Sequence, residues 1–327
     1  MPATIEYTTG IDSDLLEQIN QGGEGRIFEF VNDQATIYKE FFFSSRHPPN
    51  LRALQQLITV MESCSEKERM YIESRTVWPR IAVTDRGRLR GYLMKRVPAQ
   101  FFRLYGLRNR PRNILCDWNY LSMRDRYENN PRLLSEIPRP NAAQISVLIA
   151  DLARTVQELH RHDVIVGDMS GQNLIWTDQP SLHVMLIDCD SFRVRGSAGV
   201  NYPKETPDWE DPVVQQGRTN QQSDIYKLGV AAYRAVWAAT THLPPRDLAD
   251  RPPPVGVPAA LPSLIARSTG TGDRPSAAEW VQGLAEPSAA APAPVAPSHV
   301  QPATRTESTS PAPSRPTIQM RPRTLGT

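Results

Sequence analysis

The sequence contains few cysteines, and they are spaced without a pattern. Its 327 residues include only three, Cys64, Cys116 and Cys189, and no two of them form a CxxC pair. An odd number of scattered cysteines predicts neither a disulfide framework nor a zinc site. We therefore expect a protein of the reducing cytoplasm.

Long apolar runs and a strong charge imbalance are also missing. No stretch approaches the roughly 18 apolar residues needed to span a bilayer, and MPATIEYTTG at the start lacks the pattern of a signal peptide. The formal net charge is only +2, whereas nucleic-acid binders usually carry a concentrated basic face. We expect neither a membrane nor a nucleic acid as partner.

The sequence does contain enough apolar residues for a core, at 39%, together with an excess of proline. Many of the 30 prolines lie after residue 286, where alanine, serine and threonine are also abundant. Such a composition buries too little apolar surface to offset the entropy lost on ordering. Residues 287–327 are therefore predicted to form a disordered tail.

Local patterns predict strands in the first part of the chain. RIFEFV and ATIYKEFFF are β-prone runs separated by NDQ, and the glycine-rich QGGEG precedes them. Residues 51–63 place apolar side chains at helical spacing, and RIAVTD and RLRGYLMKRV indicate two further strands around Arg86 and Gly87. The predicted order is strand, strand, helix, strand, strand.

The second part of the chain is predicted to be mainly helical. Residues 98–140 give mixed signals and support only a short helix, but a long amphipathic helix follows, with Asn141 as its N-cap. Short apolar runs lie between residues 164 and 188. SDIYKLGVAAYRAVW, capped by Ser223 or Asp224, and SAAEWVQGL are the last predicted helices. The predicted fold class is α+β.

Glycines and a lysine near the start could handle the phosphates of a nucleotide. Gly22, Gly23 and Gly25 could fold a turn over phosphates with backbone N–H groups exposed, since side chains would obstruct that approach. Lys39, in the following strand, could pair with phosphate oxygens. Each feature also has a plainer interpretation, because glycine-rich hairpin turns and solvated strand lysines are common.

The most specific motif follows the long helix. VIVGDMSGQNLIW places Asp168 five positions before Asn173, and Asp188 follows in LIDCDSF. Such an Asp and Asn pair could also be a loop-capping network. Together with GGEG, YKE, VWP and GYLMKRV, however, these motifs resemble the eukaryotic-like protein kinases. They are most similar to a bacterial group often associated with von Willebrand-type and metal-dependent phosphatase proteins, over residues 19 to about 285.

The resemblance implies a bilobal kinase fold. Its N-lobe would be residues 1–97, with the hinge near 94–97, and its C-lobe would be residues 98–286. The catalytic loop would be residues 164–175, and the metal-binding motif would be 188–190. The chain would then be a cytoplasmic Ser/Thr protein kinase that uses ATP.

The family's roles can be carried over to matching positions. Asp168 would be the catalytic base, Lys39 would anchor phosphates, and Asn173 and Asp188 would bind Mg²⁺ or Mn²⁺. The residues implied to bind ATP are Gly22, Gly23, Gly25, Ile27, Ile37, Lys39, Met94, Lys95, Val97 and Ile175.

The catalytic motifs depart from the family pattern. Ser170 stands where protein kinases usually carry a lysine that stabilises the transferring phosphate. Cys189 and Asp190 replace the usual Phe-Gly. We expect Cys189 to be a packed core thiol, whereas Asp190 could either add a metal ligand or cap the turn.

Other family contacts are harder to assign. Glu62 would be the helix glutamate that pairs with Lys39, with Glu66 and Glu68 as alternatives. Asp224 resembles the aspartate that ties the catalytic loop, and Arg274 resembles the buried arginine of the C-lobe. TPDWEDP resembles a degraded Ala-Pro-Glu motif, so docking of a peptide substrate is not assured.

Two other functions stay open on these residues. A pseudokinase would bind ATP as a signalling scaffold without transfer, which Ser170 favours, and a small-molecule kinase is permitted by the degraded TPDWEDP segment. The tail could be an autophosphorylation or partner-docking segment, or only a spacer. The resemblance implies ATP and a protein substrate as partners, with a metal-dependent phosphatase and a von Willebrand-type protein as further candidates.

Overall fold

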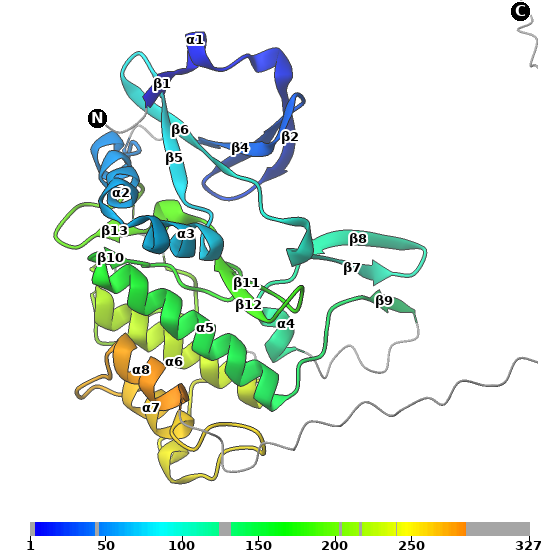
Figure 1. Ribbon diagram of the computed structural model, residues 1–327, viewed down its shortest axis with the longest axis vertical. Helices are drawn as coiled ribbons and strands as arrows, with labels where there is room; N and C mark the ends of the chain where they lie inside the picture. The colour runs from blue at the N-terminus through cyan, green and yellow to red at the C-terminus, as the bar shows by residue number, and fades with distance from the viewer. Residues whose placement is uncertain are drawn as a thin grey trace, which may run out of the picture. The chain divides into compact units, whose positions relative to one another are not determined.

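The computed structural model describes residues 4–42, 46–123, 132–202, 205–215, 218–239 and 241–285. These residues belong to one compact unit, Met1–Ala291. The unit combines helices with several small sheets, so the predicted α+β class is confirmed (Figure 1). The predicted tail, 287–327, lies outside the described residues.

A six-stranded sheet forms the first part of the unit. Its strands in spatial order are β1 (Thr4–Glu6), β5 (Pro79–Asp85), β6 (Arg88–Lys95), β4 (Asp33–Phe41), β3 (Gly25–Phe30) and β2 (Leu16–Gln21). Only β1 runs parallel to its neighbour, and a short helix, α1 (Tyr7–Gly10), follows it. The predicted strands are present, and the turn between β5 and β6 has positive φ at Arg86 and Gly87.

Two glycines allow the strands around β4 to approach closely. A Cβ on Gly25 would lie 2.1 Å from the backbone oxygen of Glu40, and one on Gly91 would lie 2.1 Å from that of Lys39. Neither position could carry a side chain without displacing backbone. Strands β3 and β6 can therefore pack closely on both sides of β4, the strand that carries Lys39.

Helices α2 (Leu51–Ser63) and α3 (Glu66–Arg75) follow the sheet's fourth strand in sequence. The predicted helix 51–63 is confirmed; its apolar stripe is buried, and the side chain of Asn50 accepts a hydrogen bond from the N–H of Ala53. Helix α3 was not predicted. Ile72 is its one buried residue, so apolar periodicity gives no signal there, and a capping box of Ser65 and Glu68 starts the helix.

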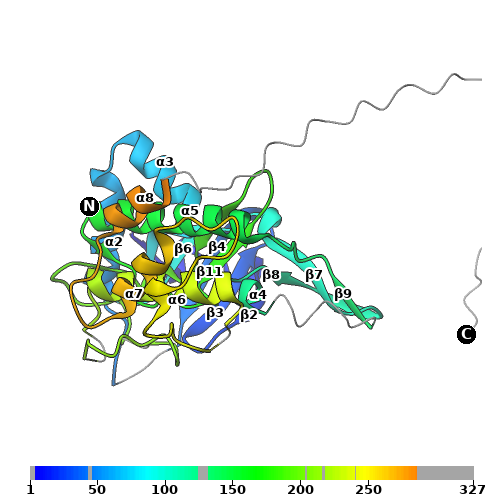
Figure 2. The ribbon, with the colours of Figure 1, turned by 90° about the horizontal axis from the view of Figure 1, so that it is seen from below.

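The segment 98–140 contains more structure than its sequence indicates. It forms the short helix α4 (Asn119–Ser122) and a three-stranded sheet in the order β8 (Arg110–Leu115), β7 (Phe102–Leu107), β9 (Leu133–Ser135). This sheet projects away from the helices in both views (Figures 1 and 2). Strand β8 is largely exposed, so its side chains lack the alternation that would predict a strand.

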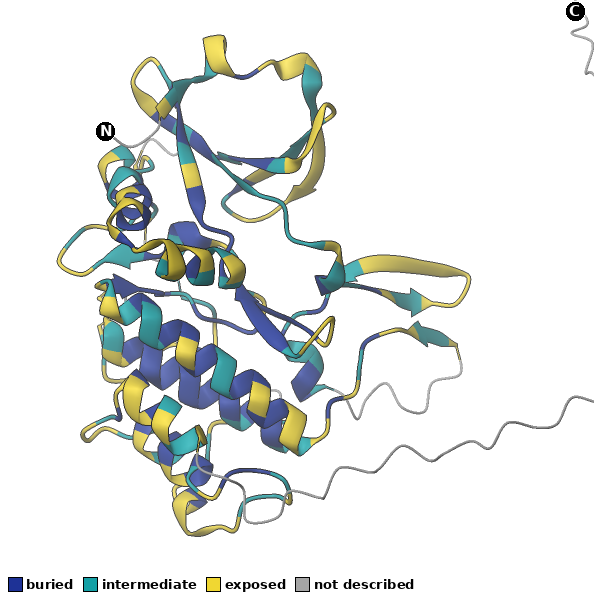
Figure 3. Ribbon diagram, viewed as in Figure 1, coloured by how far each residue is buried: buried dark blue, intermediate teal, exposed yellow. Residues whose placement is uncertain are grey.

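Four helices build the second part of the unit: α5 (Ala142–Arg161), α6 (Gln221–Trp237), α7 (Leu261–Thr269) and α8 (Ala277–Ala285). Asn141 caps α5 as predicted. The N-cap of α6 is Asn220, not Ser223 or Asp224, because the side chain of Asn220 accepts the N–H of Ser223. Figure 3 shows the buried residues concentrated along α5 and α6.

Two short ladders lie between the large sheet and helix α5 (Figure 1). Strand β10 (Val164–Ile165) pairs with β13 (Arg193–Val194), and β11 (Leu174–Thr177) pairs with β12 (His183–Leu186). Leu174 lies opposite Leu186. Residues just before β11 and just after β12 therefore emerge at the same end of this ladder. In the described part of the chain, the helices are too short or too polar to cross a bilayer.

Candidate active site

One face of the large sheet carries Lys39 and several of the apolar residues expected to bind ATP. Alternate residues of β4 share a face, so Ile37 and Lys39 project together. Ile27 lies opposite Lys39 on β3, while Tyr92 and Met94 on β6 lie opposite Lys39 and Ile37. Strand pairing therefore places a lysine among apolar neighbours on a single surface.

Lys39 is almost fully buried and contacts two carboxylates. Its Nζ lies 2.7 Å from Oδ1 of Asp190 and 3.2 Å from Oδ1 of Asp188, and the residue is 5% exposed. Burial opposes the ammonium form, but the charges of Asp190 and Asp188 outweigh it and raise the pKa of Lys39. The lysine is therefore charged at neutral pH and held at the junction of the sheet with the residues after β12.

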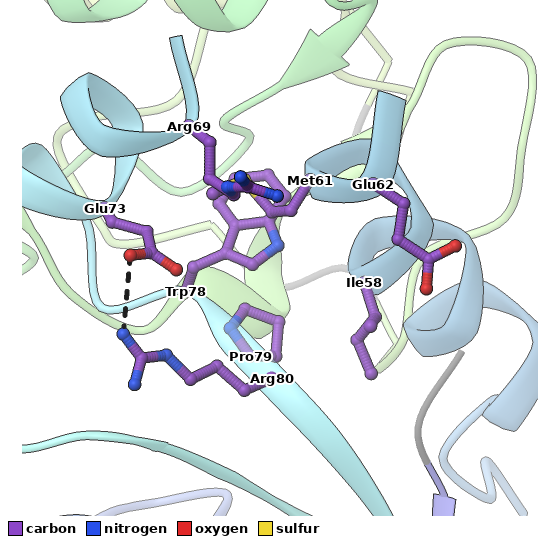
Figure 4. A pocket seen from close by; sticks show the side chains of 8 residues that line it. All are labelled: Ile58, Met61, Glu62, Arg69, Glu73, Trp78, Pro79 and Arg80. Carbon is purple, nitrogen blue, oxygen red and sulfur yellow. Dashed lines mark ion pairs between the residues drawn. The ribbon is translucent and has the colours of Figure 1, made fainter. Parts of the chain in front are cut away.

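The partner of Lys39 differs from the expected glutamate. Glu62 is exposed on α2, where it lines a pocket together with residues of α2, α3 and β5 (Figure 4). Glu66 is exposed, and Glu68 caps α3 through Ser65. The expected pairing with Glu62 is wrong, because the aspartates after β12 take that place.

The contact of Asp190 with Lys39 was missed by sequence reasoning. Asp190 is 2% exposed, and besides Lys39 its carboxylate accepts hydrogen bonds from the hydroxyl of Tyr92 and from Nδ2 of Asn201, each at 2.8 Å. These contacts engage both oxygens, so in this structure Asp190 holds Lys39 in place. The available signal was the spacing of two aspartates around a buried Cys189.

The local backbone explains how two neighbouring aspartates reach one lysine. Asp188 adopts φ 55° and ψ 46°, and a single turn of 3₁₀ helix follows over Cys189–Ser191. A left-handed residue followed by a tight turn reverses the chain direction. Cys189 then points into the core, as expected, while Asp188 and Asp190 flank it.

Asn173 and Asp188 lie at the same end of the β11–β12 ladder. The backbone N–H of Ile187 donates to the carbonyl of Asn173 at 3.0 Å, which brings the two segments together. The Asp188 side chain is 53% exposed, and only its Oδ1 contacts Lys39. The second carboxylate oxygen of Asp188 and the amide oxygen of Asn173 are therefore available to a cation. Oxygen is the donor type that Mg²⁺ and Mn²⁺ prefer. These residues fit the expected metal.

Asp168 is tied to Asn173 and to a threonine far along the chain. Nδ2 of Asn173 donates to Oδ2 of Asp168 at 3.0 Å and to its backbone carbonyl at 2.8 Å. Thr206 donates its hydroxyl to Oδ1 at 3.0 Å. The amide of Asn173 thus points its nitrogen at Asp168, which leaves its oxygen for other partners. Asp168, Asn173 and Asp188 form one connected group.

Helix α6 holds the loop before Asp168 in place through hydrogen bonds. The carboxylate of Asp224 accepts the N–H of Val166 at 2.9 Å and that of Gly167 at 3.0 Å. Gly167 has φ +76°, and a Cβ there would lie 2.9 Å from the Ser191 carbonyl oxygen, so a glycine is required. The expected role of Asp224 in tying this loop matches these contacts.

A lysine does lie close to the loop, although not where the family pattern has one. Ser170 is 1% exposed, whereas Nζ of Lys227 on α6 donates to the Gly167 carbonyl at 2.6 Å and to Oε1 of Glu205 at 2.8 Å. Lys227 is fully buried, and Glu205 balances its charge. It therefore holds the loop in position and is not available to a ligand.

Arg274 fixes the segment that contains TPDWEDP. Its guanidinium forms two hydrogen bonds with the carboxylate of Asp211, at 2.5 and 2.8 Å, and both side chains are almost fully buried. It also donates to the Gln222 carbonyl at the start of α6. The degraded motif thus keeps a carboxylate that pairs with the buried arginine.

The expected adenine-binding residues lie beside this group. Met94, Val97 and Ile175 pack in one apolar cluster with Val77 and Phe101. The Lys95 side chain instead donates to the Glu73 carbonyl, so only its backbone could serve as expected. Of the three glycines, Gly25 is required by packing, while a Cβ on Gly22 or Gly23 would meet open space.

Comparisons of the sequence with protein-family models and with curated proteins gave no match.

Proposed function

We propose that this chain is an ATP-dependent Ser/Thr protein kinase with a bilobal kinase-like fold. One observation carries the proposal: residues from three segments come together. Lys39 on β4 donates a hydrogen bond to Asp188 after β12, and Asn173 donates one to Asp168 within the loop before β11. Phosphoryl transfer needs a cation for the phosphates, oxygen ligands for the metal and a carboxylate at the acceptor hydroxyl. This group supplies all three.

Each residue has a defined task in the proposed reaction. Mg²⁺ bound by Asn173 and Asp188 would neutralise negative charge on the phosphates of ATP. Lys39 binds phosphate oxygens through Nζ, and Asp190 keeps that ammonium in place. Asp168 accepts the proton of the acceptor hydroxyl at a carboxylate oxygen, at present engaged by Thr206. The apolar cluster with Met94, Val97 and Ile175 would receive the base.

A second function, a pseudokinase that binds ATP without transfer, is favoured by a specific observation. The position of the usual loop lysine is the buried Ser170, and the nearby Lys227 is neutralised by Glu205. A missing transition-state cation can cost several kcal/mol. In either case the protein substrate or partner, the cytoplasmic location and a role for residues 287–327 remain part of the proposal.

The experiment is transfer from labelled ATP in the presence of Mg²⁺ or Mn²⁺, to the chain itself and to generic protein acceptors. Asp168→Asn should lower incorporation about 10²–10⁴-fold, because the proton acceptor is lost, and Asp188→Ala should abolish it. Asp247→Asn changes an exposed aspartate paired with Arg251 and serves as the matched control. It should transfer label at the parent rate.

The outcomes separate the two functions. Incorporation that disappears in both site variants but persists in the control establishes the kinase. Metal-dependent ATP binding with no incorporation in the parent supports the pseudokinase. Incorporation that survives in Asp168→Asn and Asp188→Ala contradicts both.

A further inference from the structure

The three-stranded sheet of β7, β8 and β9 is fixed at its base and exposed at its far end. At the base, the guanidinium of Arg103 donates a hydrogen bond to Oδ1 of Asp178 at 2.6 Å. The ring of Tyr105 lies 5.6 Å from that of Tyr120 on α4, measured between centroids. Beyond these contacts the sheet projects away from the helices (Figures 1 and 2). Its far end is therefore held in a defined position and is open to solvent.

Strand pairing places five side chains of this sheet on one face. Leu107 on β7 lies opposite Arg110 on β8 and opposite Leu133 on β9. Tyr105, two residues before Leu107, lies opposite Arg112. Residues that pair directly share a face, and so do alternate residues of one strand. We call the surface made by Tyr105, Leu107, Arg110, Arg112 and Leu133 the tip face.

The tip face is basic and has no compensating acid in its own strands. Strands β7, β8 and β9 contain three arginines and no aspartate, glutamate or lysine, and their opposite face carries no charged side chain. Arg103 is paired with Asp178. Arg110 and Arg112 are exposed, and neither guanidinium has an ion pair or hydrogen bond within the described part of the chain. Two positive charges are thus available to a partner.

Apolar surface lies directly beside these two charges. Leu107 is 52% exposed, and Tyr105 and Leu133 are half-buried. The arginines belong to β8 and the apolar residues to β7 and β9, so a basic row runs along the sheet next to an apolar one. Arginine and tyrosine are enriched in protein interfaces. A complementary partner has an acidic row beside an apolar row.

We propose that the tip face binds an acidic amphipathic helix of another protein. Such a helix presents an apolar stripe bordered by charged residues, and a helix packed on the face of a sheet is a stable arrangement. Its carboxylates would pair with Arg110 and Arg112, whose planar guanidinium groups match carboxylate geometry. Its apolar stripe would cover Leu107 and Leu133.

A nucleic acid fits the tip face less well. Proteins that bind single strands stack bases on aromatic side chains along a basic groove, but the ring of Tyr105 is already packed against Tyr120. The tip face offers only two exposed arginines, and the net charge of the whole chain is +2. The exposed side chain of Leu107 is matched by an apolar stripe and not by phosphates.

The base of the sheet lies next to the candidate active site. Leu115, the last residue of β8, packs in the apolar cluster that contains Ile175. Asp117, two residues later, forms a β-bridge with Ile175. A partner bound at the tip face would therefore be attached to the segment that joins the sheet to this site. The inference does not depend on the proposed kinase activity.

The test measures binding of labelled helical peptides to the full chain by fluorescence anisotropy. The probe has leucines at helical spacing bordered by glutamates, and two matched peptides replace every glutamate with glutamine or with lysine. The parent should bind the glutamate peptide saturably, and salt should weaken this binding because it screens exposed charges. The glutamine peptide should bind more weakly, and the lysine peptide should not bind.

Variants then locate the binding surface. Arg110→Glu/Arg112→Glu should weaken binding of the glutamate peptide at least about tenfold, since two attractive pairs become repulsive. Arg52→Glu/Arg88→Glu makes the same change in net charge at exposed positions on α2 and β6 and should bind as the parent does. Leu107→Ser should weaken binding and leave its salt dependence unchanged.

The lysine peptide protects the test against misfolding. It should bind Arg110→Glu/Arg112→Glu more tightly than it binds the parent, which a misfolded variant would not do. The proposal would be overturned if the parent did not bind the glutamate peptide, or if both double variants bound it equally well. Tighter binding of an oligothymidine than of the glutamate peptide at the tip face would also overturn it, in favour of a nucleic acid.

Discussion

Two buried lysines, Lys39 on β4 and Lys227 on α6, have different surroundings. Lys39 contacts two carboxylates, and one of them, Asp188, has a side chain that is 53% exposed. Lys227 contacts Glu205, which is 5% exposed, and a backbone carbonyl. The first lysine faces a carboxylate that solvent reaches, while the second is enclosed with its counterion.

The difference separates a group that can exchange partners from one that cannot. A charge whose counterion is open to solvent can bind a ligand without being left unpaired, and a buried charge with one enclosed counterion is costly to disturb. We therefore interpret Lys39 as a binding residue and Lys227 as the residue that fixes the loop before Asp168.

The largest effect on stability is expected at Lys227. Lys227→Met would leave Glu205 buried without its partner and should lower the free energy of unfolding by about 3–5 kcal/mol. Urea denaturation measures the change. Lys67→Met, on the exposed face of α3, is the matched control and should stay close to the parent.

The double variant Lys227→Met/Glu205→Gln sharpens this prediction. It removes both charges, so it should recover part of the lost stability. A double variant as unstable as the sum of its parts would mean that the ion pair is not what holds the loop.

A smaller effect is expected when the two aspartates around Lys39 are compared. Asp190→Asn weakens a buried, charged set of hydrogen bonds and should cost about 1.5–3 kcal/mol of unfolding free energy. Asp188→Asn alters a half-exposed carboxylate and should cost no more than about 1 kcal/mol. Chemical denaturation of the two variants tests the order, and equal losses would contradict the division of roles between holding Lys39 and binding a cation.

A separate effect, on the pH dependence of stability, concerns Asp117, which lies beside Ile175. Burial raises the pKa of Asp117 to about 6 from 3.8. The folded state binds this proton more tightly than the unfolded state, so protonation of Asp117 favours the folded state. This contribution to stability is complete below pH 3.8 and is lost as the pH rises through about 6. The parent should lose about 2 kcal/mol across this window relative to Asp117→Asn.

Denaturant midpoints measured between pH 4 and 7 would reveal that slope. Asp247→Asn should run parallel to the parent, because its carboxylate is exposed and bonded to Arg251. An Asp117→Asn profile that also runs parallel would show that the carboxyl is not desolvated.

The sequence predicts the elements that bury a regular stripe of apolar residues and misses those that bury little. Helix 51–63 and the helix after Asn141 carry apolar stripes, so their periodicity predicts them. Helix α3 and strand β8 bury little, and pattern alone cannot find them. Motif spacing also named Lys39, Asp168, Asn173 and Asp188 as candidate site residues, and the structure brings them together.

Contacts between distant segments could not be predicted in the same way. The pairing of Lys39 with Asp190 depends on a left-handed Asp188 and a single tight turn, which no local propensity specifies. The position of Lys227 under the loop depends on the packing of α6. Glu62 was chosen for its place along a helix, but the side of that helix facing Lys39 is decided by tertiary packing.

Calorimetric titration of the chain with ATP, with and without Mg²⁺, tests the proposed nucleotide and metal site most directly. We expect tighter binding with Mg²⁺ in the parent, no metal effect in Asp188→Ala, and a full metal effect in Asp247→Ala. The proposal would be contradicted if the parent did not bind ATP. It would also be contradicted if Mg²⁺ tightened ATP binding as much in Asp188→Ala as in the parent.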